Sequence, residues 1–516
     1  MGDYTKLPKN LSRRDFLKSV GGTAAITGLA LGGVAAPQDA AAECGALPKK
    51  WDASADIIVV GTGFAGLAAA IEARNAGADV LVIDKMPVWG GNSIINGGDF
   101  AAPGNKWQKE QGIQDSPDLM LKDMLKAGAY LNRPELARIV CEQSAEALEW
   151  CQTYIGAKFS RLNYQGGHSV RRAVQTDNAS GSGLVNPMLA KAKELGVRVQ
   201  LRTKLTRFLS NKDGRIVGIE VRKGYTFPDD SSGRPAYLKA RRSMVLTSGG
   251  FSQDLKLRQI QDPRITEKFT STNHPGATGE ALLAACTAGA MTVQMDWIQL
   301  GPWTSPDEKG FGQVPQFTER IVGWSPMINP KTGKRFIKET GDRKVRADAI
   351  ILIGEPVIIF GDSYAVSKNV LPITLEKAME IGAIKKFGSL EELAKDHNIP
   401  LAPFKEEIAR WNSFVEKKKD DDFDCMIFPD AKPTATPPFY AARLWPRVHY
   451  CMGGLVIDKN AQVMGLDFKP VKGLYAAGEV TGGVHGAVRL GSVAMATCVV
   501  FGRIAGRSAA KEQPWA

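Results

Sequence analysis

The segment Ala55–Gly66, which reads ADIIVVGTGFAG, decides the fold that this sequence predicts. Its first six residues form the short apolar, β-branched run that a buried parallel strand requires. The glycines that follow have separate uses: Gly61 makes a tight turn, Gly63 lets a pyrophosphate touch the backbone, and Gly66 permits close packing of a helix on the strand. An Ala/Leu-rich stretch through Arg74 predicts that helix, whose N-terminus would offer N–H groups to phosphates. The segment therefore predicts a dinucleotide site.

A second predicted strand, residues 79–83, strengthens this interpretation. It ends at Asp84, 18 residues after Gly66, near the position expected for a carboxylate that accepts a ribose hydroxyl. A lone G-x-G-x-x-G motif is weak evidence and is compatible with a mere structural turn. Because strand, helix, second strand and acid follow in order here, we favour the dinucleotide site over the turn.

Glycine-rich stretches far apart in the chain indicate which dinucleotide binds. Segments 89–98, 241–251 and 472–480 carry such stretches, and a long Gly/Ala helix is expected from Gly491. A site assembled from both ends of a chain suits a bulky FAD, whereas a nicotinamide enzyme typically completes its site within one contiguous domain. The residues expected to bind FAD are Gly61, Gly63, Phe64, Ala65, Gly66, Asp84, Lys85, Gly91, Asn92, Ser93, Gly97, Gly98, Gly249, Gly279, Gly478, Glu479, Arg489 and Ser492.

The composition is that of an ordinary globular protein. The chain has 516 residues, of which 44% are apolar and 23% charged, and this excludes a disordered or fibrous protein. Lys and Arg exceed Asp and Glu by 66 − 54 = 12, a mild bias that favours acidic substrates or partners. No compact Lys/Arg run predicts nucleic-acid binding. None of the seven cysteines stands at C-x-x-C spacing, so we expect no zinc ribbon, no haem attachment and no metal site.

The first forty-two residues resemble an export signal. Paired arginines, Arg13 and Arg14, precede a weakly apolar stretch at 20–36 and a small-residue cleavage site at 40–42. This arrangement predicts a twin-arginine signal peptide, and therefore a periplasmic protein that folds around its cofactor before export. The alternative is an amphipathic N-terminal helix with a chance Arg-Arg pair. No later segment offers about 18 uninterrupted apolar residues, so stable membrane insertion is not expected.

From residue 52 to about 510 the sequence resembles the soluble, flavocytochrome c type fumarate reductases of the succinate dehydrogenase/fumarate reductase superfamily, in a methacrylate- or enoate-reductase-like branch. Many motifs in one order carry this resemblance. They are the opening glycine motif, Gly91-Asn92-Ser93 with Gly97-Gly98, Thr318-Glu319, Gly333–Phe336 leading to Gly341-Asp342-Arg343, His449–Gly454, and Ala477–Gly486 leading to Arg489-Leu490-Gly491.

The resemblance implies an α/β fold in which a Rossmann-like FAD-binding domain, a parallel sheet with helices, is interrupted by an α+β capping domain. We expect the signal at 1–42, the two parts of the FAD-binding domain at 43–295 and 446–516, and the capping domain at 296–445. Helical patterning at 389–418 is compatible with part of the cap, and a solvated helical linker is the alternative there.

The same resemblance implies a chemistry, the reduction of a C=C bond conjugated to a carboxylate. By resemblance, His449 and Arg489 hold the carboxylate, Arg343 protonates the α-carbon, and Glu319 reprotonates Arg343. Thr318 is expected to be a further substrate-binding residue. The planar fork of arginine suits a carboxylate clamp. Each residue also has a plainer interpretation: a surface arginine, a satisfied core histidine, or a Thr-Glu pair at a helix start.

Departures from the family bear on the substrate. Gly301 stands where fumarate reductases carry a histidine that grips a second carboxylate, and extra residues follow at 305–312. Val322 replaces a usual arginine. Aromatic and apolar groups cluster in sequence where the far end of the substrate should lie: Trp303, Phe317, Trp324 and Met327. A second carboxylate left without its donor would cost about 1–3 kcal/mol. The sequence therefore predicts an unsaturated monocarboxylate, either methacrylate- or acrylate-like or aryl-substituted, with fumarate as a poorer substrate.

The absence of a C-x-x-C-H motif predicts that electrons come from a separate periplasmic c-type cytochrome. No histidine lies at 90–98, where membrane-bound relatives attach their flavin, so we expect non-covalent FAD. Two rival functions remain open. One is a ketosteroid Δ1-dehydrogenase type of enzyme, which needs a tyrosine as proton acceptor, and the other is a flavin-loaded electron carrier without turnover.

Overall fold

The computed structural model describes residues 47–515. The predicted export signal at 1–42 lies outside the described residues, so that interpretation stays a prediction.

The fold is built on an eight-stranded sheet whose centre is parallel. In its main path the order is β18-β19-β9-β1-β2-β6, and the antiparallel strands β7 and β8 extend it from β9. Val60, at the end of β1, pairs with Ile83 of β2 and with Leu246 of β9. The glycine-rich turn therefore follows the central strand, as the sequence predicts. The strands are β1 (Ala53–Val60), β2 (Val80–Ile83), β6 (Arg198–Gln200), β7 (Thr203–Ser210), β8 (Ile216–Lys223), β9 (Arg234–Leu246), β18 (Gln462–Met464) and β19 (Pro470–Ala476).

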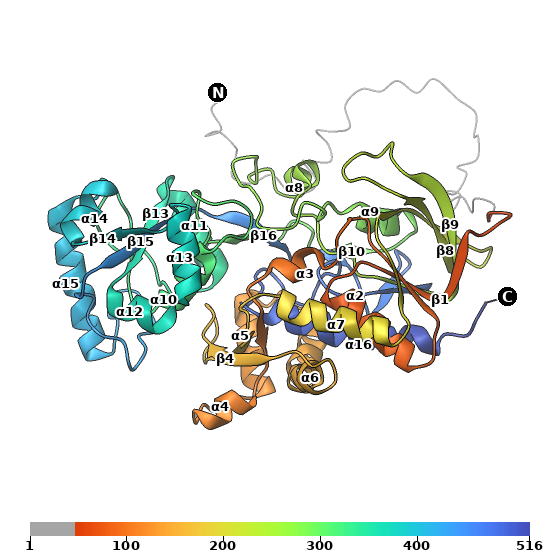
Figure 1. Ribbon diagram of the computed structural model, residues 1–516, viewed down its shortest axis with the longest axis horizontal. Helices are drawn as coiled ribbons and strands as arrows, with labels where there is room; N and C mark the ends of the chain where they lie inside the picture. Colours follow the sequence, from red (N-terminus) through yellow and green to blue (C-terminus); the bar gives the residue numbers. More distant parts are fainter. Residues whose placement is uncertain (1–46, 516) are drawn as a thin grey trace, which may run out of the picture. The chain divides into compact units, whose positions relative to one another are not determined.

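Two helices from opposite ends of the chain pack against each other beside this sheet (Figure 1): α2 (Phe64–Asn75) and α16 (Val493–Lys511). Glycines in α16 make the contact possible. A Cβ at Gly502 would lie 2.5 Å from the Ala65 carbonyl oxygen, and one at Gly506 would lie 2.2 Å from that of Ala69. This close packing joins the C-terminal helix to the dinucleotide-binding helix.

Helix α16 is long and apolar enough to cross a membrane by length and composition alone, but 72% of its most apolar window is buried inside the protein. It is therefore a core helix of this fold.

Further elements complete the FAD-binding part. A small sheet has the order β3-β5-β4, and two two-stranded sheets pair β10 with β17 and β11 with β16. These elements are α3 (Gly91–Ile95), β3 (Asp99–Ala101), α4 (Lys106–Glu110), α5 (Pro117–Ala127), α6 (Pro134–Thr153), β4 (Phe159–Asn163), β5 (Ala173–Thr176), α7 (Ser182–Glu194), α8 (Leu255–Gln261), α9 (Glu280–Thr287), β10 (Thr292–Val293), β11 (Ile298–Gly301), β16 (Arg447–Cys451) and β17 (Gly454–Leu455).

The segment between β11 and β16 forms an α+β unit around the antiparallel sheet β12-β13-β15-β14 (Figure 1). Because β11 pairs with β16, the chain enters and leaves this unit side by side, next to the predicted boundaries at 296 and 445. Its elements are α10 (Val314–Ile321), β12 (Met327–Ile328), α11 (Arg343–Ile353), β13 (Val357–Gly361), α12 (Ser363–Asn369), α13 (Pro372–Glu380), β14 (Lys385–Phe387), α14 (Leu390–Asp396), α15 (Leu401–Lys417) and β15 (Phe439–Leu444).

The helical pattern at 389–418 corresponds to α14 and α15, and both helices bury apolar side chains in the cap. Leu393 and Phe404 pack in one cluster with strands of the cap sheet, and Trp411 is fully buried in another. The alternative of a solvated linker is therefore wrong.

Candidate active site

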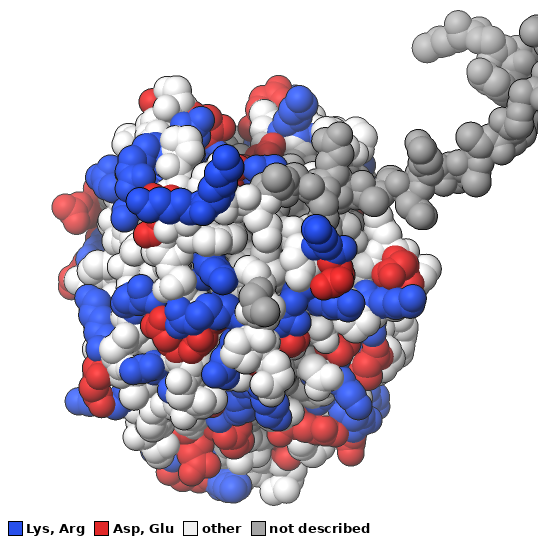
Figure 2. Space-filling model, turned by 90° about the vertical axis from the view of Figure 1, so that its right-hand side faces the viewer, with Lys and Arg blue, Asp and Glu red and all other residues white. Residues whose placement is uncertain are grey.

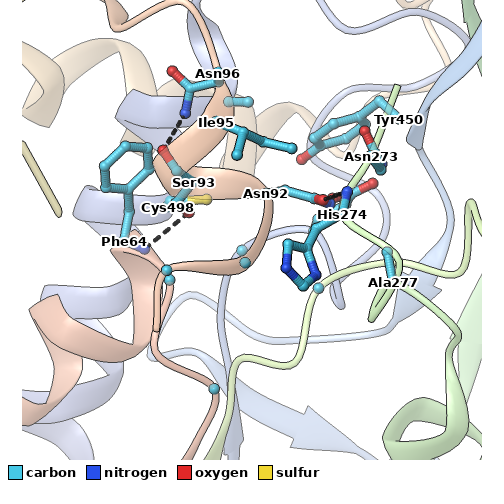
Figure 3. A pocket seen from close by; sticks show the side chains of 18 of the residues that line it. Phe64, Asn92, Ser93, Ile95, Asn96, Asn273, His274, Ala277, Tyr450 and Cys498 are labelled. Atoms are coloured by element: carbon cyan, nitrogen blue, oxygen red, sulfur yellow. Dashed lines mark hydrogen bonds between the residues drawn. The ribbon is translucent and has the colours of Figure 1, made fainter. Parts of the chain in front are cut away.

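One long cavity collects residues from both ends of the chain and from the cap. Figure 3 shows Phe64, Ser93 and Cys498 on one side of it and His274 and Tyr450 on the other. Every residue predicted to bind FAD lines this cavity except Gly66 and Gly98.

Those two glycines act beside the cavity. A Cβ at Gly66 would lie 2.0 Å from the Gly61 carbonyl oxygen, so Gly66 provides the close helix–strand packing expected of it. Gly98 has a φ of +73°, and a Cβ there would lie 2.2 Å from Thr176 Oγ1. Gly98 itself does not line the cavity, and the bend between Asn96 and β3 is what requires glycine there, so its predicted contact with FAD stays a prediction.

The cavity fits a dinucleotide diphosphate. The N-termini of α2 and α16 both line it, and neither N-cap residue caps its helix with its own side chain, although Ser93 Oγ accepts a hydrogen bond from the Phe64 amide at the start of α2. Gly63 is the N-cap of α2 and leaves the backbone accessible, while Ser492 is the N-cap of α16. Because uncapped N–H groups and the positive ends of helix dipoles favour anions, this part of the cavity is suited to phosphates and to electron-rich flavin atoms.

Asp84 supports the glycine-rich turn as well as lining the cavity, and Lys85 lines the cavity beside it. The Asp84 carboxylate accepts hydrogen bonds from the Thr62 amide at 3.0 Å, the Thr62 hydroxyl at 2.5 Å and the Met86 amide at 2.9 Å. Lys85 Nζ forms an ion pair with Glu280 at 2.8 Å. Hydrogen bonds and an ion pair thus hold Asp84 and Lys85 in place at this end of the cavity. Motif spacing predicted a role for Asp84 but did not predict these contacts.

Glu479 connects the two halves of the site. Its carboxylate accepts hydrogen bonds from the Cys451 amide at 3.0 Å and from the Asn92 side-chain amide at 3.2 Å. Burial raises the pKa of Glu479 above its ordinary value. Ser93 Oγ in turn accepts a hydrogen bond from the Phe64 amide at 3.0 Å, at the start of α2.

At the cap end of the cavity lie three basic side chains, Arg343, His449 and Arg489. Arg343 and Arg489 are 5% and 4% exposed, so a surface role for either is excluded. The Nε atoms of both arginines are buried without a hydrogen-bond partner among residues 47–515. A pocket that gathers buried cationic donors and leaves them partly unsatisfied is suited to an anionic ligand.

Burial and the closeness of these basic groups lower the pKa values of Arg343 and His449. Burial and the charge of Arg489 hold the pKa of Arg343 well below its ordinary value. Burial, Arg489 and Arg343 likewise lower the pKa of His449, so its ring is neutral near pH 7. Its Nδ1 lies 2.8 Å from the Thr272 hydroxyl, which orients the ring in the cavity. His449 is therefore held by a partner and also faces the ligand space.

Glu319 also lines the cavity, whereas Thr318 does not. Both lie in the second half of α10, whose N-cap is Gln313, so the helix-start interpretation is wrong. Thr318 is fully buried in the cap. Its hydroxyl is buried without a hydrogen-bond partner among residues 47–515, and its predicted contact with substrate stays a prediction.

The structure corrects the role of Gly301. It does not line the cavity, and a Cβ there would lie 3.0 Å from the Trp303 ring. Trp303 is 2% exposed and fills that space. Its ring stands edge-on to His449 at 4.6 Å, and the Arg343 guanidinium lies 5.1 Å from its centre. Gly301 therefore makes room for Trp303, which forms the wall.

The predicted aromatic lining is correct only for Trp303. Phe317 and Met327 are buried in the apolar core of the cap, because α10 and β12 turn these side chains inward. Trp324, in the turn between these two elements, is buried in a second apolar cluster. Phe311, which sequence analysis missed, lines the cavity instead, with its ring 6.0 Å from His449. Phe311 lies within the extra segment 305–312. That insertion was the feature of the sequence that could have indicated an additional residue at the cavity.

Glu308 fixes the loop that carries Phe311. Its carboxylate accepts hydrogen bonds from the amides of Gln313, at 2.7 Å, and Val314, at 3.0 Å, at the start of α10. Arg447 donates to the main-chain carbonyls of Glu308 and Gly310 in the same loop. Burial raises the pKa of Glu308 to about 6.

Comparison with known proteins defines the class. The FAD binding domain family matches residues 56–495, so the chain belongs to this family and its cofactor is FAD. It is 42% identical to the acrylate reductase flavoprotein subunit of Shewanella woodyi (strain ATCC 51908 / MS32) over 506 residues, 96% of this chain and 98% of the relative. It is 35% identical to a fumarate reductase (cytochrome) of Shewanella frigidimarina, over 88% of this chain and 77% of the relative.

A solved structure agrees. A flavocytochrome c3 fumarate reductase in its open conformation matches with a TM-score of 0.70 at 33% identity, covering 89% of this chain and 79% of that one. The predicted family, α/β fold and FAD are thereby confirmed.

Proposed function

We propose that the protein is an exported FAD-dependent reductase that adds two electrons and two protons across the C=C bond of an α,β-unsaturated monocarboxylate. The observation that carries the proposal is the convergence of Arg343, His449 and Arg489 at one end of the FAD cavity, beside the Trp303 wall. The near-full-length similarity to an acrylate reductase flavoprotein supports the substrate class.

In the proposed reaction each residue of the site has a separate role. Reduced FAD, when bound, supplies a hydride to the β-carbon. Arg489 and His449 hold the carboxylate and draw electron density from the alkene. Arg343 then gives a guanidinium proton to the α-carbon, which completes the saturated acid. The lowered pKa of Arg343 makes this proton more acidic than that of an ordinary arginine. Glu319 is the nearby carboxylate through which Arg343 regains its proton.

The far wall of the cavity favours a monocarboxylate. Trp303 and Phe311 present rings where a second carboxylate would have to be buried, with ring centres 5.6 Å apart. Arg447, a cation close to this loop, is committed to main-chain carbonyls. A dicarboxylate would thus lose water without gaining a donor, at a cost of about 1–3 kcal/mol.

The rival dehydrogenase needs a tyrosine that accepts a proton. Tyr450 lines the cavity, but burial holds its pKa well above its ordinary value, which opposes that role. The Arg489 guanidinium stacks 4.8 Å from its ring centre and favours a carboxylate ligand nearby.

Export and the electron donor are part of the proposal. The twin-arginine pattern at the start of the chain supports a periplasmic location, and the similarity to a fumarate reductase (cytochrome) supports a c-type cytochrome as donor. On the face seen in Figure 2, Lys and Arg are interspersed with Asp and Glu. Replacing Arg13 and Arg14 by Lys should keep the protein in the cytoplasm, and unchanged export would contradict this part.

A panel of acids tests the proposal. The anaerobically reduced protein is mixed with acrylate, methacrylate, fumarate, cinnamate or urocanate, and flavin absorbance reports reoxidation. We expect the small monocarboxylates to react fastest. A clear preference for fumarate would overturn the monocarboxylate assignment, and reoxidation by none of the acids would overturn the reductase.

A further inference from the structure

Helix α11 carries two buried arginines on one face. Arg343 is its first residue and Arg346 follows three positions later, a spacing that places side chains next to each other on a helix. Arg343 lines the cavity, whereas Arg346 does not line it and is fully buried. The pair therefore connects the ligand space with the interior of the cap.

Arg346 contacts Glu319 directly. Its Nη2 lies 2.5 Å from Glu319 Oε1, and its Nη1 donates to the Glu339 carbonyl at 3.1 Å. The second oxygen, Glu319 Oε2, is buried without a hydrogen-bond partner in the described part of the chain. Arg346 thus fixes one carboxylate oxygen and leaves the other free on a residue that faces the cavity.

The buried ion pairs of Arg335, in the same cap, provide a comparison in which every carboxylate oxygen is bound. Arg335 is fully paired: its guanidinium binds both carboxylate oxygens of Glu339, at 2.7 and 2.6 Å, and both of Asp420, at 3.1 and 2.7 Å. Glu339, Asp420 and Cys425 have the spacing of a metal site, but Arg335 occupies the space between the two acids. Glu319 differs because its Oε2 has no hydrogen-bond partner in the described part of the chain, although the Gly166 main chain also lowers the pKa of this carboxyl.

We propose that Arg346 is a positioning residue for proton transfer, which keeps Glu319 ionised and aims its free oxygen toward Arg343. This inference rests on the proposed function, since Glu319 needs a fixed charge only if Arg343 donates a proton. Arg343 and Arg346 act on Glu319 from α11, and Arg489 and Tyr164 are the other titratable groups close to it. Burial alone would raise the pKa of Glu319, but Arg346 and Arg343 lower it below its ordinary value.

The test compares Arg346→Met with Arg335→Met in the FAD-loaded protein. Arg335→Met breaks a buried ion pair of the same cap without touching Glu319, so it reports what loss of structure alone does. Flavin reoxidation by acrylate is followed by anaerobic stopped flow across pH 5–9, in H2O and D2O. Propionate, the saturated product, serves as a non-reacting ligand whose binding is read from the flavin spectrum.

For Arg346→Met we expect reoxidation to slow by about 100-fold, with a larger solvent isotope effect. The acid limb of the rate profile lies below the measured range in the wild type, because the pKa of Glu319 is lowered, and it should move up into that range when loss of the cation raises this pKa. Propionate binding should be unchanged. Arg346→Lys, which retains the charge, should show a smaller shift, and it takes over the test if the Met variant loses its FAD.

An Arg346 variant whose pH profile and isotope effect match those of Arg335→Met would overturn the inference. If instead the wild-type protein is reoxidised by no unsaturated acid, the proposed function itself has failed.

Discussion

At the scale of single residues, the main feature of the site is positive charge that is buried away from water. Arg343 and Arg489 are both buried, and burial is the largest cause of the lowered pKa of each. Two buried arginines close to one neutral histidine are costly unless an anion joins them. The substrate carboxylate is that anion in our account, so binding and activation of the alkene depend on the same charges.

Arg343 provides the most direct test at this scale. In Arg343→Met we expect alkene-dependent flavin reoxidation to fall by at least about 100-fold, since the proton donor is lost. FAD content should be unchanged because Arg343 lies at the cap end of the cavity. Stopped-flow absorbance measures the first quantity and the flavin-to-protein ratio the second. Retention of wild-type reoxidation would show that another group donates the proton.

Gly301 and Trp303 give a coupled prediction. Gly301→His alone should weaken the reaction with acrylate and not improve that with fumarate, because Trp303 occupies the space into which the new side chain would point. The double variant Gly301→His/Trp303→Ala should raise the ratio of fumarate to acrylate kcat/KM. Trp303→Ala is the control for loss of the ring alone. An improved fumarate rate in the single variant would mean that Trp303 is not the wall.

At the scale of elements, the loop before α10 combines packing with a titration. Glu308 has a pKa raised to about 6 in the folded protein, against 4.5 for an ordinary glutamic acid. A raised pKa in the folded protein means that folding favours the protonated form of Glu308. The stabilisation that protonated Glu308 contributes is therefore fully present below pH 4.5 and is lost as the pH rises through 6. The shift corresponds to about 2 kcal/mol.

We therefore expect the free energy of unfolding of wild type, relative to that of Glu308→Gln, to fall by about 2 kcal/mol between pH 4.5 and 7. Denaturant unfolding at several pH values measures it. A difference between the two proteins that does not vary with pH would contradict the raised pKa.

The contact of α2 with α16 is the second element-scale feature. Gly506→Val should destabilise the protein by about 1–3 kcal/mol or more and reduce FAD retention, because the new side chain meets the α2 backbone. Ser508→Ala, on the half-buried side of the same helix, is the matched control. Thermal unfolding of both variants, with and without added FAD, separates them. Equal melting temperatures would show that the helices can move apart without cost.

At the scale of the whole molecule, the sequence predicts features that follow a local motif. It does not predict side-chain orientations and contacts that form only when distant segments pack together. The strand–glycine–helix unit around Gly61 was predicted correctly, since each of its residues has a conformational reason to be there. Phe317 was placed wrongly because its aromatic character does not reveal which face of α10 turns inward. Arg346 and Phe311 were missed, since only the folded cap brings them to Glu319 and His449.

The central claim is that the protein reduces a C=C bond with electrons from its own flavin. The most direct measurement mixes the reduced protein with one equivalent of acrylate in the absence of oxygen and quantifies propionate. Our account predicts one propionate for each reoxidised FAD, formed at least about 100-fold more slowly by the Arg343→Met variant. Flavin reoxidation without propionate, or no reoxidation at all, would contradict it.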